Sequence, residues 1–362
     1  MKALFVGWGD VAQRFYAPAI QRFRIDSSSI TIAERPGLSR EIPGLDVAEW
    51  GSADLKARLA SGEFDRIILL SPPQEHTGQV LRLLELLEGV SHSCLIATEK
   101  PLGLDADATR RDVQALRERE NASNHRVRCI DHYVEKWTTR VLSRLGYRGL
   151  SKLLGKLKHI QFVSMEEKQL WDSTAFEYGY FREHGVHAWA VLEAIGLAAP
   201  SSQLEAIAPA RLWRHLGCPE SCRGDTAALA QYAATLPGGE SAKISLAIGK
   251  GVGKTRKALR VVGEKRALTA SFDAEEFHSM TYAEALGGEI VHAQSTLPKQ
   301  EPYDRIVVGL LGGRIDTSVT LSAESALWHV EAIAAALETP GGTPESYESG
   351  SLPSELADAI SD

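Results

Sequence analysis

Lys100 is the residue best placed to carry a positive charge into a site. It follows Glu99, which can hold the ammonium group, and precedes Pro101, which fixes the exit of the chain. A cis peptide bond before Pro101 would make a tight turn there. A positive charge at such a point can polarise an oxygen atom on which negative charge develops. Taken alone, the three residues also fit a charged loop without any chemistry.

Glu183 and His187 are a second group with the residue types of acid–base chemistry. They stand four residues apart at the start of an apolar segment that predicts a helix with both on one face. The carboxylate can there fix the tautomer and the orientation of the imidazole, as a general base requires. Taken alone, such a pair is more typical of a structural polar contact.

Strands must place these groups at one edge of a sheet. The apolar run 93–97 predicts a strand that ends just before Lys100, and open α/β sheets bind ligands beyond the C-terminal ends of their strands. Residues 127–130 predict the next strand. A polar cluster follows it in the same position and consists of Asp131, His132, Tyr133 and Lys136. Its histidine and lysine, four residues apart, suit a phosphate or a polyol.

A glycine motif near the N-terminus lies between a short apolar run, 3–6, and a helical pattern from Gln13 to about Phe23. It has the G-x-G-x-x-A form of the dinucleotide fingerprint, in which glycines allow a tight turn and a close approach to pyrophosphate. Free N–H groups and the dipole at the helix N-terminus would hold the phosphate. The predicted cofactor-binding residues are Gly7, Trp8, Gly9, Asp10, Val11 and Ala12.

Glu34 and Arg35 follow the second predicted strand, 29–33, where nicotinamide cofactors are distinguished. An acidic residue there can accept both ribose hydroxyls of NAD, whereas an arginine can receive the 2′-phosphate of NADP. Glu34 comes first, at the usual acidic position. The sequence therefore favours NAD and leaves NADP possible.

A further strand, 65–70, runs into a proline-rich loop and then into a helix over about 77–87. The prolines stop the strand and shape a rigid loop at the ligand edge of the sheet. His76 fits a pocket residue and a helix start equally well. The cofactor-binding candidates of this loop and of the lysine loop are Ser71, Pro72, Pro73, His76, Glu99 and Lys100.

The composition is that of an ordinary globular protein with two domains. The chain has 362 residues, of which 44% are apolar, and a net charge of −7 without a basic stripe, so no nucleic-acid partner is expected. No apolar run has the length of a membrane helix, and the N-terminus does not resemble a signal peptide. Cys218 and Cys222 have the wrong spacing for a zinc pair. We expect a cytoplasmic protein with no metal and no membrane contact.

The pattern changes after Lys136 from repeated strand–helix units to longer strands with fewer helices. It predicts an α/β fold with a dinucleotide-binding domain at 1–125, a second α/β domain at 126–338 and a loose tail at 339–362. The run 249–255 looks like a phosphate loop but lacks its first glycine. It predicts instead a hairpin turn between antiparallel strands.

Four motifs occur together: Gly7-x-Gly9-x-x-Ala12, Ser71-Pro72-Pro73 with His76, Glu99-Lys100-Pro101 and Glu183-x-Gly185-x-His187. Together they resemble the glucose–fructose oxidoreductase / inositol dehydrogenase / rhizopine-catabolism (Gfo/Idh/MocA) family, to about residue 338. The resemblance implies a Rossmann domain, a second α/β domain with a large open, mostly antiparallel sheet, and NAD(P)-dependent chemistry on a sugar or cyclitol hydroxyl. It makes Lys100 the catalytic lysine and His187 the acid/base histidine, and Glu183 stands where the family usually has aspartate.

Five segments carry a second resemblance: Gly9-Asp10-Val11-Ala12, Glu99-Lys100-Pro101-Leu102-Gly103, Asp131-His132-Tyr133-x-x-Lys136, Gly179-Tyr180-Phe181-x-Glu183-x-Gly185 and Pro302-Tyr303-Asp304-Arg305. They look like glucose-6-phosphate dehydrogenase, in which the His-Tyr-x-x-Lys part grips the substrate phosphate. This chain is expected to be much shorter than members of that family. Ala188-Trp189 and Glu193-Ala194 stand where they have Arg-Asp and Asn-His, which speaks against lactone-forming oxidation at the anomeric carbon.

The leading hypothesis is an NAD(P)-dependent dehydrogenase of a secondary hydroxyl on a sugar phosphate or a related sugar or cyclitol. His187 would take the hydroxyl proton and Lys100 would polarise the oxygen, with Glu183 beside them. The alternatives are a dehydrogenase of an unphosphorylated cyclitol or amino sugar intermediate and a nucleotide-binding sensor without catalysis. The substrate-binding candidates are Asp131, His132, Tyr133, Lys136, Glu166 and His184. The open sheet face would suit a homodimer or homotetramer, as is frequent in the family.

Overall fold

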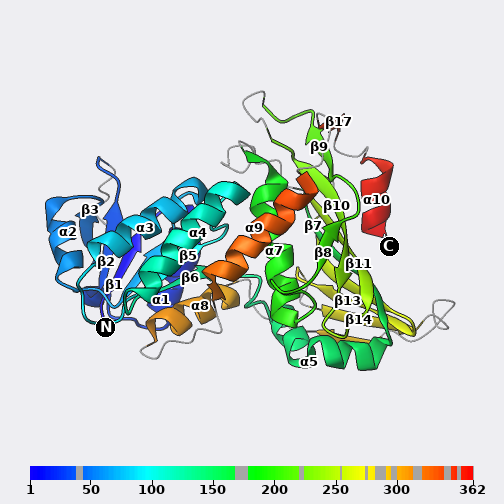
Figure 1. Ribbon diagram of the computed structural model, residues 1–362, viewed down its shortest axis with the longest axis horizontal. Helices are drawn as coiled ribbons and strands as arrows, with labels where there is room; N and C mark the ends of the chain where they lie inside the picture. Colours follow the sequence, from blue (N-terminus) through cyan, green and yellow to red (C-terminus); the bar gives the residue numbers. More distant parts are fainter. Residues whose placement is uncertain are drawn as a thin grey trace. The chain divides into compact units, whose positions relative to one another are not determined.

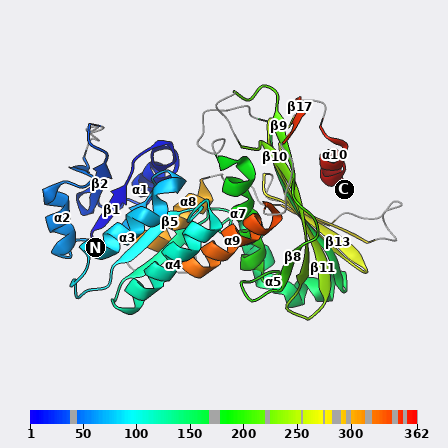
Figure 2. The same cartoon turned by 45° about the horizontal axis from the view of Figure 1, so that its top comes forward.

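The computed structural model describes residues 1–37, 44–167, 178–219, 224–252, 255–273, 276–281, 291–294, 300–312, 320–337, 344–348 and 352–361 (Figures 1 and 2). The chain forms two compact units: the first consists of 1–135 and 298–330, the second of 136–297 and 331–362. Each unit is built on one large sheet. The predicted α/β fold class is confirmed.

The first unit alternates strands and helices along most of its length. Its strands are β1 (Ala3–Val6), β2 (Ile30–Glu34), β3 (Asp46–Glu49), β4 (Arg66–Leu69), β5 (Leu95–Glu99), β6 (Arg126–Ile130) and β16 (Leu321–Ser322). Its helices are α1 (Ala17–Arg22), α2 (Ala53–Ala60), α3 (His76–Leu86), α4 (Ala106–Asn121) and α8 (Glu301–Leu311). Shorter helical turns are η1 (Ala12–Tyr16), η2 (Ser27–Ser29) and η3 (Pro73–Glu75), and α9 (Ala323–Leu337) begins here and ends in the second unit.

The sheet of the first unit has the order β3-β2-β1-β4-β5-β6-β16. Strands β1 to β6 are parallel, and the short β16 runs antiparallel beside β6. This is the strand order of doubly wound sheets that bind dinucleotides. From β1 the chain adds strands first toward one edge, β2 and β3, and then from β4 onward toward the other, so the switch point lies between β1 and β4. The glycine motif follows β1 and the Ser-Pro-Pro segment follows β4. Both motifs therefore flank the crevice where such sheets bind ligands.

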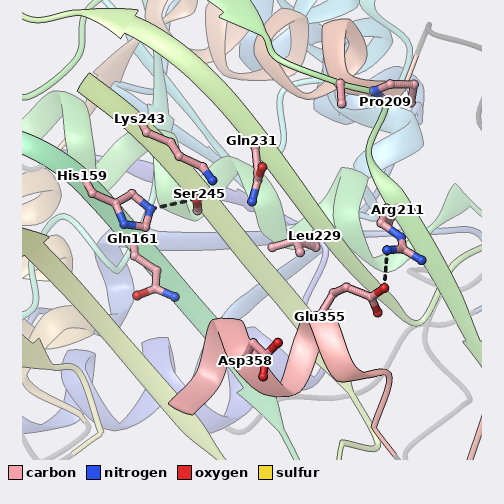
Figure 3. Close-up of a pocket in the computed structure, with 11 residues that line it drawn as sticks. His159, Gln161, Pro209, Arg211, Leu229, Gln231, Lys243, Ser245, Glu355 and Asp358 are labelled. Carbon is pink, nitrogen blue, oxygen red and sulfur yellow. Dashed lines mark hydrogen bonds and ion pairs between the residues drawn. The ribbon is translucent and has the colours of Figure 1, made fainter. Parts of the chain in front are cut away.

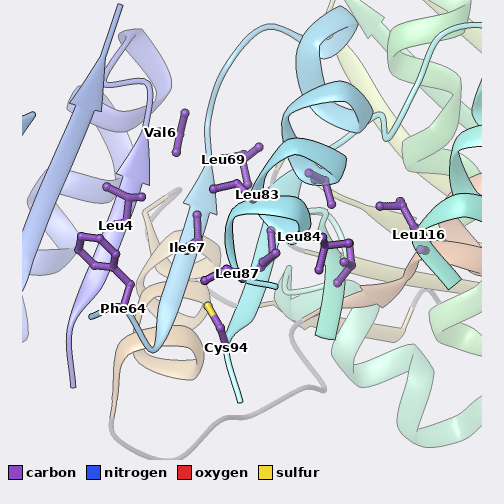
Figure 4. Close-up of a cluster of buried hydrophobic side chains, with 14 of the residues drawn as sticks. Leu4, Val6, Phe64, Ile67, Leu69, Leu83, Leu84, Leu87, Cys94 and Leu116 are labelled. Carbon is purple, nitrogen blue, oxygen red and sulfur yellow. The ribbon is translucent and has the colours of Figure 1, made fainter. Parts of the chain in front are cut away.

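Apolar side chains cover both faces of this sheet. One layer packs Leu4 of β1 with Leu83 of α3 and Leu116 of α4 (Figure 4). The other packs Phe5 of β1 with residues of η1 and α1 and with Ile306 of α8. Parallel strands buried on both sides are continuous apolar runs. That is why β1, β2, β4, β5 and β6 could be recognised in the sequence, whereas the largely exposed β3 and the two-residue β16 could not.

Residues 298–330 return to the first unit, which differs from the predicted domain limits of 1–125 and 126–338. Tyr303 of α8 stacks on Phe15 of η1, with ring centroids 4.3 Å apart. Asp304 forms an ion pair with Arg22 of α1. Strand β16 then pairs with the edge strand β6. These contacts join segments about 190 to 290 positions apart, which no local pattern can predict.

The second unit has long strands and few helices. Its strands are β7 (Leu157–Glu166), β8 (Leu204–Ala206), β9 (Arg211–His215), β10 (Ala227–Thr235), β11 (Ser241–Lys250), β12 (Arg256–Gly263), β13 (Arg266–Ser271), β14 (Glu276–Thr281), β15 (Val291–Gln294) and β17 (Glu345–Tyr347). Its helices are α5 (Trp137–Leu154), α7 (Tyr180–Ile195) and α10 (Ser354–Ser361).

The sheet of the second unit is large and mostly antiparallel, in the order β15-β14-β13-β12-β7-β11-β10-β9-β17, with β8 beside β10. Only the pairs β7–β11 and β9–β17 are parallel among the described strands. The run 249–255, of which Gly253 and Lys254 lie outside the described residues, joins β11 to β12. These strands lie on opposite sides of β7, so the predicted hairpin turn is wrong.

Helices α5 and α7 cover one face of this sheet, and α10 lies on the other (Figures 1 and 2). Tyr232 of β10 meets Trp189 of α7, with ring centroids 4.9 Å apart. On the opposite face Leu356 of α10 is fully buried among strand residues. Among the residues described, no helix has the length and apolar character needed to cross a membrane.

The C-terminal segment is built into the second unit where it is described. Strand β17 extends the sheet beside β9, and the hydroxyl of its Tyr347 donates a hydrogen bond of 2.7 Å to the carbonyl oxygen of Lys250. The prediction of a loose tail over 339–362 is therefore wrong for 344–348 and 352–361. The rest of that stretch lies outside the described residues.

Candidate functional site

The loop after β1 contains two glycines with different surroundings. Gly7 has a φ of +86°, and a Cβ atom there would lie 3.3 Å from backbone atoms of Leu70 and Ser71. Glycine is required at this position by conformation and by the close approach of the next loop. At Gly9 a Cβ atom would meet no atom of the described residues within 4 Å. Packing gives no reason for glycine at this position, whereas a phosphate close to the backbone would.

The first helical turn after this loop is wider than expected. The sequence predicts an α-helix from Gln13, but Ala12–Tyr16 form a π-helical turn that precedes α1. Such turns are frequent at functional sites. The backbone N–H of Gln13 donates to the Gly9 oxygen at 3.0 Å, and its side-chain amide donates to the Trp8 oxygen at 2.9 Å. These bonds hold the loop against the helical turn.

Glu34 connects the end of β2 to the glycine loop. Its Oε1 accepts a hydrogen bond of 2.6 Å from the backbone N–H of Trp8. The Trp8 indole is buried and packs edge-on against Phe5, with ring centroids 5.4 Å apart. Asp10 is exposed and pairs with Arg14. The acidic group expected to meet a ribose therefore lies at the glycine loop.

His76 is buried at the start of α3 and bridges two loops. Its Nδ1 lies 2.7 Å from the carbonyl oxygen of Pro101, and its Nε2 lies 2.7 Å from that of Ser71. Burial lowers the pKa of His76, although both carbonyl oxygens favour the protonated ring. His76 therefore joins the Ser-Pro-Pro loop to the lysine loop.

Besides the contact with His76, the lysine loop is held by two further hydrogen bonds. Glu99 is buried and its Oε1 accepts a hydrogen bond of 2.7 Å from the Tyr16 hydroxyl. Burial raises the pKa of Glu99 to about 7, against the opposing effects of the Tyr16 hydrogen bond and of the Lys100 charge. The backbone N–H of Lys100 donates to the Ile130 oxygen at 3.1 Å. The peptide bond between Lys100 and Pro101 is cis.

The polar cluster after β6 is divided between the two units. Asp131 is buried, which raises its pKa, and its Oδ1 accepts a hydrogen bond of 2.9 Å from the Tyr133 N–H. His132 stacks on Tyr303 of α8, with ring centroids 5.1 Å apart. Lys136 belongs to the second unit, where its Nζ donates to a backbone carbonyl oxygen, that of Phe272, at 2.9 Å.

Helix α7 of the second unit carries the predicted histidines. Glu183 and His187 lie four residues apart in its first turns, as the spacing predicts, and His187 is buried. The His184 ring stacks on Tyr180 at 4.0 Å and lies 5.6 Å from the His187 ring. The Oε1 of Glu183 is 3.9 Å from the Nε2 of His184. Two imidazoles and a carboxylate thus occupy the start of one helix.

Asp225, which the sequence did not single out, fixes the N-terminus of α7. Its Oδ2 accepts the Phe181 N–H at 2.9 Å, and its carbonyl oxygen accepts the Tyr180 N–H at 3.0 Å. Burial raises the pKa of Asp225 to about 6. Gly179 precedes the helix with a φ of +99°, and a Cβ atom there would lie 2.2 Å from the Oδ1 of Asp225. Only glycine fits this contact.

Glu166, at the end of β7, meets two lysines that sequence reasoning missed. The Nζ of Lys257 lies 2.5 Å from its Oε1. Lys250 ends β11 directly beside Glu166 in the parallel register, and its ammonium is 5.7 Å from the ring centroid of Tyr180. Burial opposes the charge on Glu166, but the two lysines outweigh it and lower its pKa. The one available signal is the glycine-rich run around Lys250, and its pattern predicts a turn rather than a site.

A cavity of about 410 Å³ lies between the second sheet and α10 (Figure 3). Its floor includes His159 of β7, Gln231 of β10 and Lys243 of β11. On one side Arg211 forms an ion pair with Glu355 of α10. The sequence predicted none of this. Because α7 packs on the opposite face of the sheet, the cavity is separate from the histidines of that helix.

No protein-family model matches this chain, and no curated protein matches it. Solved structures do. An oxidoreductase from Sinorhizobium meliloti has a TM-score of 0.72 at 15% identity, with 94% of this chain and 98% of that one covered. Glucose-6-phosphate 1-dehydrogenase from Mycobacterium avium has a TM-score of 0.71 at 16% identity, with 99% and 97% covered. A 3-ketoreductase from Actinomadura kijaniata, solved with NADP and TDP-benzene, has a TM-score of 0.66 at 15% identity, with 98% and 99% covered.

These similarities show that the chain shares the fold of these oxidoreductases over nearly its whole length. At 15–16% identity the similarity concerns the fold alone.

Proposed function

We propose that the protein is an NAD(P)-dependent oxidoreductase of the Gfo/Idh/MocA type that acts on a CH–OH group of a sugar phosphate or a related sugar or cyclitol. The glycine loop carries this proposal. It lies at the switch point of a doubly wound sheet, and Gly9 is open to a ligand rather than packed against the described protein. Glu34 stands at the same loop, where the ribose hydroxyls of NAD need an acceptor. The NADP bound by the Actinomadura kijaniata enzyme supports a cofactor of this class.

Lys100 and His187 are the proposed catalytic pair, with Glu183 beside them. The nicotinamide ring, when bound, supplies the hydride acceptor or donor at its C4. Lys100 stands at the ligand edge of the first sheet and would stabilise negative charge on the substrate oxygen. His187 would take the hydroxyl proton in oxidation and return it in reduction. Its burial on α7 limits competition from water.

The phosphorylated form of the substrate is supported by positive charge near the proposed site residues. Lys136 was predicted to hold a phosphate with His132 and Tyr133, and Lys250 and Lys257 add two ammonium groups beside Glu166. An unphosphorylated cyclitol would need no such charge. A sensor without catalysis remains the third candidate, but it would not require the lysine and the histidine. A cytoplasmic homodimer or homotetramer remains part of the proposal.

A substrate panel tests the function directly. Sugars, their phosphates and cyclitols are each incubated with NAD and with NADP, and reduced nicotinamide is followed by its absorbance. Lys100→Met and His187→Ala should each lower kcat by about 100-fold or more, because general acid–base and electrostatic contributions are of that order. Their cofactor Kd values should stay within about threefold of wild type, since both groups act mainly in the transition state. Near-normal turnover of His187→Ala would remove it from the mechanism.

A further inference from the structure

Arg35, the residue that could receive the 2′-phosphate of NADP, is paired with Glu75. Arg35 follows Glu34 at the end of β2, and its guanidinium forms an ion pair with the Glu75 carboxylate on the loop after β4. The two side chains are 54% and 32% exposed, respectively, so a ligand in the crevice can reach both. The Glu34 carboxylate, by contrast, accepts the backbone N–H of Trp8 in the glycine loop.

Glu75 is itself held in position through its other oxygen. Gln79 of α3 donates to the Oε2 of Glu75 at 2.8 Å and accepts the Ser71 hydroxyl at 2.6 Å. The chain of contacts from Arg35 through Glu75 and Gln79 to Ser71 connects the end of β2 with the loop after β4. Gln79 thus holds the carboxylate beside the arginine, and Ser71 holds Gln79 in turn.

We propose that Glu75 is a determinant of cofactor choice and disfavours NADP by neutralising Arg35 and repelling a 2′-phosphate. The inference rests on the proposed NAD(P)-dependent function. A phosphate dianion at Arg35 would have to displace a carboxylate from the guanidinium or share it with one, and like charges at contact distance repel. The ribose hydroxyls of NAD are uncharged and face no such competition. The sequence offered only Glu34 and Arg35 as determinants, so Glu75 adds a third group from a different strand end.

Glu75→Gln tests the proposal, because glutamine keeps the shape and its amide oxygen can still accept from Gln79. The Kd values of NAD and of NADP are measured on the full chain by isothermal titration calorimetry. The ratio of the NADP value to the NAD value should fall about tenfold, which corresponds to the gain of roughly one charge-assisted contact. An exposed ion pair contributes little to folding, so the melting temperature should not change.

Two further variants make the test specific. Glu85→Gln is the matched control, because Glu85 lies at the far end of α3 and also pairs with arginines, Arg82 and Arg119. It should leave the ratio unchanged. Adding Arg35→Gln to Glu75→Gln should cancel most of the gain for NADP, since the two residues act on the same phosphate.

The outcomes separate this inference from the function on which it rests. If wild type binds NAD but Glu75→Gln leaves the ratio within twofold, Glu75 has no part in cofactor choice and the proposed function still stands. If the double variant keeps the whole gain, Arg35 is not the group that Glu75 controls and the inference fails. If wild type binds neither cofactor, the proposed function fails, and the inference fails with it.

Discussion

The two sheets bring their candidate residues together in opposite ways. In the first unit parallel strands end at one edge, and each candidate lies within a few positions of a strand end, as at 7–12 after β1 and 99–100 at the end of β5. In the second unit Glu166, Asp225 and Lys250 come from strand ends and loops far apart in the chain. In the doubly wound sheet the candidate residues therefore lie in short motifs. In the mixed sheet they are distant in the chain, and the pairing of the strands brings them together.

Gly9→Val is the strongest test of this contrast. A Cβ atom at position 9 would meet no atom of the described residues within 4 Å, so we expect folding stability to stay unchanged. Its branches would fill the space that the pyrophosphate needs. We expect the Kd for NAD to rise beyond the measurable range, a loss of at least about 4 kcal/mol. Calorimetric titration and thermal unfolding are measured together, and a clear drop in Tm would make Gly9 a structural glycine instead.

Gly179→Ala makes a comparable change in the second unit and should give the opposite result. The left-handed conformation and the contact with Asp225 both exclude a side chain. The free energy of unfolding should fall by about 3 kcal/mol, the sum of a backbone penalty and an overpacked contact. Urea unfolding measures it. NAD binding should survive, and a variant of normal stability that had lost NAD binding would break the contrast between the units.

Asp225→Asn should have the smallest effect, visible as a change in pH dependence. The pKa of Asp225 is about 6 in the fold, above the ordinary value of 3.8, so the folded state binds the proton more tightly than the unfolded state. The stability that this group contributes is present below about pH 4 and is lost as the pH rises through about 6.

Asparagine removes this titration and can still accept the hydrogen bond from Phe181. Between pH 4 and pH 7, wild type should therefore lose about 2 kcal/mol of unfolding free energy more than the variant. Chemical unfolding at the two pH values gives the comparison. Equal losses in both proteins would mean that Asp225 is not a buried carboxyl with a raised pKa.

Local patterns predicted much of the first unit. The glycine loop, the position of Glu34 and the turn at Lys100 each depend on residues close together in the chain. The predicted pair on α7 belongs to the same class, because four residues make one helical turn. Where strand, turn and helix follow one another directly, the sequence contains enough information to place a side chain at a sheet edge.

Long-range register could not be predicted. The connection between β11 and β12 looked like a hairpin because β7, the strand between them, is contributed by a segment about 90 residues earlier. The C-terminal segment looked loose because its composition is polar, yet Tyr347 and Leu356 are buried in the second unit. A single buried side chain can anchor a polar segment, and the average composition of the segment does not reveal that side chain.

The return of residues 298–330 to the first unit has a consequence for synthesis on the ribosome. The chain emerges from its N-terminus, so β1 to β6 are complete long before α8 and β16 exist. During that interval β6 has an unpaired edge, and the apolar surface around Phe15 and Tyr16 has no α8 to cover it. Unpaired edges and bare apolar surface are what chaperones bind and what aggregates form from. The unit that begins first is thus finished only after most of the second unit has been translated.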